Sequence, residues 1–115
     1  MSRDGHVPQI DALSAARRVE DGATLLDVRE DDEWQAGHAP AAHHVVMQQV
    51  PERYGTLPQD VEIVVVCRSG GRSQRVAEFL RAQGFEAVNL AGGMRAWAEG
   101  GLPVQTSNGT SGEVI

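Results

Sequence analysis

Short apolar runs alternate with helical segments along the whole chain, and this alternation constrains the fold most. The clearest run is VEIVVV at 61–66, whose continuous β-branched character is typical of a strand covered on both faces. The segment 71–84 follows it and has apolar residues at helical spacing, namely Val76, Phe79 and Leu80. Strands that alternate with helices favour a parallel sheet with helices on both faces. The sequence therefore predicts a protein of the α/β class.

The remaining segments continue this alternation. Strands are expected at 7–10, 23–28, 43–46 and 85–90, helices at 12–20 and 31–37, a short helical stretch at 47–55, and a glycine turn followed by a short helix within 91–101. Asp11 is a good N-cap residue for the first helix, and Gly22 is a good stop. We expect one domain over residues 1–105. The small, polar residues from Thr106 onward predict a flexible tail over 106–115.

Length, charge and cysteine content limit the classes of function. The 115 residues suit a single core, and no apolar run approaches the roughly 20 residues that span a membrane. The N-terminus lacks the apolar segment of a signal peptide, so we expect a cytoplasmic protein. One cysteine cannot form an internal disulfide, which agrees with a reducing compartment. The net charge of −6 argues against nucleic acid as a partner.

The single cysteine stands at a chemically informative place. Cys67 ends the strand predicted at 61–66, and Gly70 and Gly71 separate it from the helix predicted next. Ligands of α/β sheets bind beyond the carboxyl ends of the strands, where helix N-termini and glycine turns present backbone N–H groups. Such groups lower the pKa of a thiol and make its thiolate a nucleophile. The alternative, a small buried cysteine beside a plain turn, is disfavoured by the whole combination of residues.

Basic residues gather around this thiol in an otherwise acidic protein. Arg68, Arg72 and Arg75 lie within eight residues of one another, while the acidic residues crowd 30–33. The basic cluster predicts local attraction of anions. The acidic run is most simply explained as a solvated helix start, where carboxylates interact favourably with the helix dipole.

Three motifs together resemble one known family. CRSGGRS at 67–73 resembles the active-site loop of rhodanese-like single-domain sulfurtransferases. LLDVREDDEWQAGHAP at 25–40 is similar to the upstream signature of that family, usually DVRxxxEYxxGHIPGA, and LAGGMRAWAEGGLPV at 90–104 is similar to its C-terminal signature. The resemblance covers about 7–104, and three motifs in the right order are more specific than any one alone. It implies a five-stranded parallel sheet flanked by helices.

The resemblance also implies an activity and the residues that perform it. Cys67 would take a sulfane sulfur from an anionic donor such as thiosulfate, forming a persulfide, and pass it to cyanide, a small thiol or a protein thiol. No metal or organic cofactor is implied, and neither a nucleic acid nor a membrane is expected as a partner. The residues expected to bind the donor and hold the persulfide are the rest of the loop: Arg68, Ser69, Gly70, Gly71, Arg72 and Ser73.

The chain departs from the family pattern in one segment. Ala39-Pro40-Ala41-Ala42 stands where the family usually has Ile-Pro-Gly-Ala, so a glycine is missing from that loop. His43 and His44 follow where small or apolar residues are common. The match is weaker here, although the cysteine loop is intact.

Other conspicuous residues have structural explanations. Asp27 and Arg29 follow a predicted strand, and we favour a supporting ion pair over direct contact with the thiol loop. A metal site at His38, His43 and His44 would need further ligands, and none is evident in the sequence. The resemblance assigns His38 to local backbone contacts. The large side chains expected in core or rim packing are Trp34, Met94 and Trp97.

Two other classes of function remain open from the sequence. A phosphatase or arsenate reductase also uses a loop thiolate followed by arginine, and a regulatory module could use the fold without catalysis. The loop from Cys67 through Arg72 has six residues. In the wider family, as the resemblance implies, this length accompanies sulfur transfer, and one more residue accompanies phosphate or arsenate chemistry.

Overall fold

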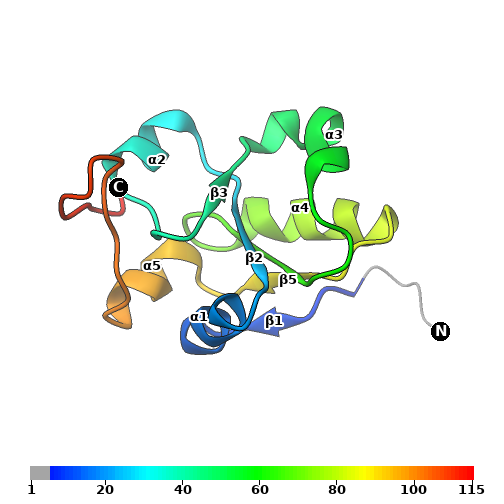
Figure 1. Cartoon of the computed structure of the whole chain (residues 1–115), viewed down its shortest axis with the longest axis horizontal. Helices are drawn as coiled ribbons and strands as arrows, with labels where there is room; N and C mark the ends of the chain where they lie inside the picture. The colour runs from blue at the N-terminus through cyan, green and yellow to red at the C-terminus, as the bar shows by residue number, and fades with distance from the viewer. Residues whose placement is uncertain (1–5) are drawn as a thin grey trace.

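A computed structural model describes residues 6–115, and its described part contains one sheet of five parallel strands (Figure 1). The strands are β1 Gln9–Ile10, β2 Thr24–Asp27, β3 His43–His44, β4 Ile63–Val66 and β5 Ala87–Leu90. Their order in the sheet is β1-β5-β4-β2-β3, and every neighbouring pair is parallel. The prediction of an α/β protein with a five-stranded parallel sheet is therefore confirmed.

Helical segments fill the intervals that the sequence predicts. They are α1 Ala12–Glu20, α2 Asp31–Ala36, the 3₁₀ turn Met47–Gln49, α3 Val50–Arg53, the 3₁₀ turn Tyr54–Thr56, α4 Gly71–Ala82 and α5 Gly93–Glu99. The carboxylate of Asp11 accepts a hydrogen bond from Ser14 N at 2.8 Å, which confirms it as the cap of α1. The predicted ends differ from the observed ones by at most two residues, and both ends of α1 are as predicted.

The two faces of the sheet carry two separate apolar clusters. Along β4 the side chains alternate, with Ile63 and Val65 in one cluster and Val64 and Val66 in the other. The first cluster lies under α3 and α4, and the second lies under α1 and α5, as Figure 1 shows on opposite sides of the sheet. Burial on both faces explains why this strand is apolar throughout.

The topology gathers loops at one end of the central strand. Because β4 lies between β5 and β2 and all three run in parallel, the segments that follow them emerge at the same edge of the sheet. These segments begin at Cys67 after β4, at Val28 after β2 and at Ala91 after β5. The edge is therefore where the cysteine loop meets the two flanking signatures.

The alanine segment that departs from the family pattern forms a turn without a glycine. Ala42 N donates to Ala39 O at 3.1 Å, and Ala39 is buried. Among residues 6–115 only glycines have positive φ angles, so Ala41 adopts a backbone conformation open to any residue. The strand β3 then follows directly and pairs with β2.

The C-terminal segment, for which composition predicts a flexible tail, makes backbone contacts with the end of α2. Gln105 and His38 exchange backbone hydrogen bonds of 2.9 Å, and Glu113 N donates to Ala36 O at 2.9 Å. Gly112 approaches Gly37 so closely that a Cβ on Gly112 would lie 2.8 Å from Gly37 Cα. Residues 105–115 thus fold back onto the end of α2, where Figure 1 shows the red end of the chain.

No helix within residues 6–115 has both the length and the apolar character needed to cross a membrane.

Candidate active site

Cys67 occupies the first position after β4 and is buried, with 1% of its surface exposed. The chain then turns through Ser69 and Gly70 before α4 begins at Gly71. Gly70 makes this turn possible, because its φ of +120° is strained for any residue with a side chain. Gly70 N donates to Cys67 Sγ at 3.1 Å. The loop therefore curls around its own sulfur.

Contacts outside the loop hold its carbonyl groups away from the sulfur. Met94 N donates to Cys67 O at 2.8 Å, and Arg95 N donates to Arg68 O at 3.1 Å, so α5 binds two successive carbonyls. Asn89 Nδ2 donates to Gly70 O at 3.2 Å. With its carbonyl groups directed outward, the loop is free to present N–H groups to the sulfur.

Gly93 allows α5 to approach the loop this closely. Its φ is +61°, and a Cβ at this position would lie 2.5 Å from Cys67 O and from Arg68 O. These distances are much shorter than a van der Waals contact, and the main-chain atoms of the loop cannot easily move away, so a side chain at position 93 would displace the loop. The second glycine of the C-terminal signature is thus explained by the shape of the cysteine loop.

The environment of Cys67 favours its thiolate. Burial raises the pKa of the thiol, but hydrogen bonds from the Ser73 side chain and from the backbone of Ser73, Gly70 and Ser69 together outweigh it. The pKa of Cys67 is consequently below the usual value of a cysteine. This outcome agrees with the expectation that the loop holds a negatively charged sulfur against amides.

Within residues 6–115, Ser73 contributes the one side-chain hydrogen bond to the sulfur. Its Oγ lies 3.2 Å from Cys67 Sγ and 2.6 Å from Asn89 Oδ1. Both Ser73 and Asn89 are buried. The sequence singled out Ser73 but gave no indication of Asn89.

Arg72 is paired with a carboxylate from a distant segment. Its two terminal nitrogens donate to the two oxygens of Glu33 at 2.8 and 2.9 Å. Hydrogen bonding from Arg72 holds the pKa of Glu33 below its usual value. The description of the whole acidic run as a solvated helix start is therefore wrong for Glu33, whose side chain is 13% exposed. Glu33 occupies the glutamate position of the upstream signature, and this was the available sequence signal that its side chain has a specific contact.

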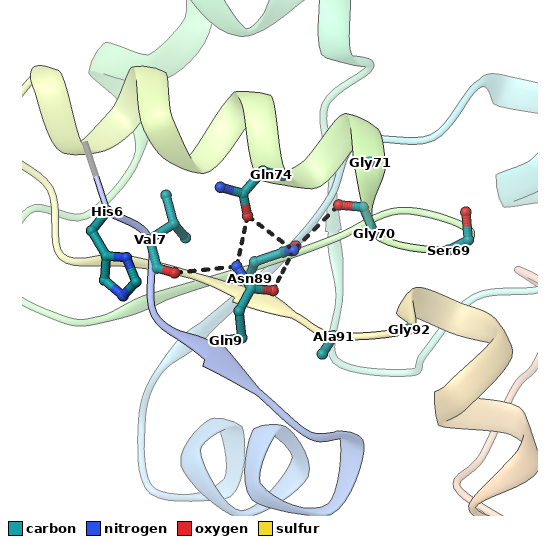
Figure 2. Close-up of a pocket in the computed structure, with 10 residues that line it drawn as sticks. All are labelled: His6, Val7, Gln9, Ser69, Gly70, Gly71, Gln74, Asn89, Ala91 and Gly92. Carbon is teal, nitrogen blue, oxygen red and sulfur yellow. Dashed lines mark hydrogen bonds between the residues drawn. The ribbon is translucent and has the colours of Figure 1, made fainter. Parts of the chain in front are cut away.

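The remaining loop residues lie toward solvent. Arg68 is exposed, and its Nε donates to the main-chain oxygen of Ile115 at 2.7 Å. Ser69, Gly70 and Gly71 line one wall of an open pocket of about 510 Å³ next to the end of β5 (Figure 2). The structure therefore brings Gly70, Ser73 and the backbone to the sulfur, while the arginine side chains contact other segments.

Asp27 and Arg29 form the ion pair that the sequence favours. Arg29 donates to the Asp27 carboxylate through Nε and Nη2, with the shortest contact at 2.8 Å, and both side chains are fully buried. Arg29 also donates to Gly37 O at 2.8 Å. The pair thus ties the end of β2 to the end of α2, the helix that supplies the partner of Arg72.

An aromatic stack braces the same helix. The ring of Trp34 lies between those of His38 and His44, with centroid separations of 3.5 and 4.6 Å and nearly parallel planes. His38 Nδ1 donates to Trp34 O at 2.8 Å, which confirms its expected local backbone contact. Within residues 6–115 no three histidine, cysteine or carboxylate side chains are grouped closely enough to hold a metal ion.

Comparison with known proteins agrees with this geometry. The rhodanese-like domain model matches residues 11–100. The thiosulfate sulfurtransferase GlpE of Vibrio cholerae is 34% identical over 104 residues, which cover 89% of this chain and 98% of that protein. YtwF of Bacillus subtilis, provisionally named a sulfurtransferase, is 45% identical over 86 residues, covering 75% of this chain and 84% of YtwF.

A solved structure shows the same fold. The crystal structure of a rhodanese-related protein from Thermoplasma volcanium has a TM-score of 0.80 and 31% identity, covering 84% of this chain and 96% of that one. The chain belongs to the rhodanese-like domain family.

Proposed function

We propose that this protein is a sulfurtransferase that carries a sulfane sulfur on Cys67. The observation that carries the proposal is that Cys67 Sγ accepts hydrogen bonds from Gly70 N at 3.1 Å and from the Ser73 hydroxyl at 3.2 Å. These bonds keep the pKa of the thiol below its usual value. The names of the related proteins support the same activity. A lowered pKa supplies the thiolate that attack on sulfur requires.

The proposed reaction begins with thiosulfate as the donor. The Cys67 thiolate attacks the outer sulfur, a new S–S bond forms, and the S–S bond of thiosulfate breaks so that sulfite leaves with the electron pair. The persulfide then loses its outer sulfur to cyanide or to a thiol, which regenerates the thiolate. Preorganised N–H groups around the reacting sulfur stabilise the charge without reorganising during the reaction.

The other predicted residues are assigned supporting roles within this proposal. Arg68 is exposed and would attract an arriving anion, exchanging its contact with the main-chain oxygen of Ile115 for one with the anion. Arg72 orients the loop through its two bonds to Glu33 and contributes positive charge close to the sulfur. Asp27 and Arg29 hold in place the two ends of α2, the helix that carries Glu33.

The test follows the sulfur atom itself. Incubation of the full chain with thiosulfate should add one sulfur atom to the protein mass, and cyanide should remove it as thiocyanate. Cys67→Ser preserves the size of the side chain and should neither gain the sulfur nor turn over. Unchanged turnover in that variant would contradict the proposal. Because the loop has six residues, we expect negligible hydrolysis of aryl phosphates in the same preparation.

A further inference from the structure

The carboxamide of Asn89 is held in one orientation by its neighbours. Its Nδ2 faces Gly70 O at 3.2 Å, Gln9 Oε1 at 2.9 Å and Gln74 Oε1 at 3.4 Å (Figure 2). The carbonyl oxygen of Gly70 can only accept, so the nitrogen of Asn89 must be the atom that faces it. The oxygen of Asn89 then necessarily faces Ser73.

The two glutamines are fixed in the same way. Gln9 Nε2 donates to the carbonyl oxygen of Val7 at 3.1 Å and to Gln74 Oε1 at 2.7 Å. Gln74 Nε2 donates to the carboxylate of Glu78 at 3.1 Å. Each amide therefore has an acceptor that cannot reverse its role, and no member of the network can flip without losing a hydrogen bond.

Ser73 has a single hydroxyl proton and two acceptors. Asn89 Oδ1 lies 2.6 Å from its Oγ, and Cys67 Sγ lies 3.2 Å from it. While the thiol is protonated, its S–H can donate to Ser73 Oγ and the hydroxyl can donate to Asn89, so every group is satisfied. When the thiol loses its proton to solvent, the hydroxyl must turn to the sulfur and leave the buried oxygen of Asn89.

We infer that Asn89 is a positioning residue that competes with the Cys67 thiolate for the hydroxyl proton of Ser73. No covalent bond other than S–H breaks in this exchange, since the hydroxyl proton only changes its direction. Asn89 therefore opposes formation of the thiolate through Ser73 while it shapes the loop through Gly70 O. The role deepens the proposed function, because it assumes that Cys67 is the reacting group.

Charged groups around the sulfur are not altered by this exchange. Arg72 of α4 lies close enough to interact with the Cys67 charge, and it is itself bonded to Glu33 of α2. The buried charges at the end of β2, Asp27 and Arg29, are paired with each other. Arg68 of the loop is bonded to the main-chain oxygen of Ile115, and α5 faces the loop with backbone N–H groups. Substitutions of Asn89 and Ser73 change none of these charges.

The experiment titrates the thiol in four forms of the full chain: wild type, Asn89→Leu, Ser73→Ala and the double variant. The readout is the ultraviolet absorbance of the thiolate against pH, with Cys67→Ser subtracted to remove the titration of other groups. Cys67 is the only cysteine, so the signal reports one site. It does not depend on sulfur transfer, so failure of the inference is distinguishable from failure of the proposed activity.

The inference predicts the direction in which each variant changes the pKa of the Cys67 thiol. Asn89→Leu should lower the pKa of the thiol by about half a unit to one unit, the equivalent of one hydrogen bond. Ser73→Ala should raise it, and adding Asn89→Leu to Ser73→Ala should produce no further decrease. An unchanged or raised pKa in Asn89→Leu, or an equal decrease with and without Ser73, would overturn the inference. So would a Ser73→Ala variant that titrates like wild type.

One further variant tests whether loosening the amide network is enough to change the pKa of the thiol, and a second replaces Asn89→Leu if that variant does not fold. Gln74→Leu removes one acceptor of Asn89 Nδ2 but keeps the bond between Ser73 and Asn89, and it should titrate like wild type. A decrease as large as that of Asn89→Leu would overturn the inference. If Asn89→Leu does not give the circular dichroism spectrum of the folded protein, Asn89→Ala removes the same oxygen with a smaller side chain, and the same outcomes decide.

Discussion

Replacing Arg29 by methionine should destabilise the protein more than any surface substitution. Both members of the pair with Asp27 are fully buried, and Arg29 additionally binds Gly37 O. Methionine fills similar space but donates no hydrogen bond. The Asp27 carboxylate would then keep only the hydrogen bond from the backbone N–H of residue 29, at 3.1 Å, which methionine also provides.

The size of the effect follows from the uncompensated carboxylate. Removing one partner of a buried ion pair costs about 3–5 kcal/mol of unfolding free energy. That is a large part of the roughly 5–15 kcal/mol available to a domain. At about 4 °C per kcal/mol for a chain of this length, the melting temperature should fall by roughly 12–20 °C.

The assay is urea and thermal unfolding followed by circular dichroism, with an exposed ion pair as the control. Arg18 and Glu62 are 2.8 Å apart with side chains 44% and 27% exposed, so Arg18→Met should cost less than about 1 kcal/mol. Adding Asp27→Leu to Arg29→Met should recover stability, because it removes the stranded charge. Equal losses from Arg29→Met and Arg18→Met would refute the reasoning.

Three further predictions follow from single contacts. Gly93→Ala should greatly reduce sulfur loading from thiosulfate, measured by protein mass, since its Cβ would meet the main chain of the cysteine loop; Gly109→Ala, with open space around it, is the control for positive φ. Because Arg72 lowers the folded-state pKa of Glu33, that carboxylate stabilises the fold above the usual pKa of glutamate. Its contribution disappears as pH falls through the lowered value, so wild type and Glu33→Gln should converge in urea unfolding at acid pH. The amide of Gly112 should be protected in hydrogen exchange, whereas a flexible tail would leave it unprotected.

The sequence predicts the strands, the helices and the cysteine loop because these depend on neighbours in the chain. Apolar runs and glycines act within a few residues, and so does the donation from Gly70 N to Cys67 Sγ three positions away. Contacts between distant segments were not predicted. Arg72 and Glu33 are 39 residues apart, and the one signal for Glu33 was its place as the glutamate of the upstream signature.

In the C-terminal segment, amino-acid composition also does not predict contacts with a distant part of the chain. Small polar residues are typical of flexible ends, but they also suit a tight turn that packs closely against another segment. Gly112 lies where a Cβ would meet Gly37 Cα at 2.8 Å and Ala36 O at 3.0 Å. Here the absence of side chains permits packing, and composition alone does not separate that role from flexibility.

The geometry also shows which groups stabilise the charge of the sulfur. The sequence assigned backbone N–H groups to the thiolate and the arginines to the attraction of anions, and in the structure Arg72 is bonded to Glu33 and Arg68 to the main-chain oxygen of Ile115. The groups that hydrogen-bond to the sulfur and lower the pKa of Cys67 are neutral, a hydroxyl and backbone N–H groups, while the charge of Arg72 also interacts with that of the thiolate. Dipoles act over short distances, so the thiolate depends on the shape of the loop more than on the net charge of the protein. The residues that bind the loop carbonyls from outside, on β5 and α5, therefore belong to the chemistry of the site.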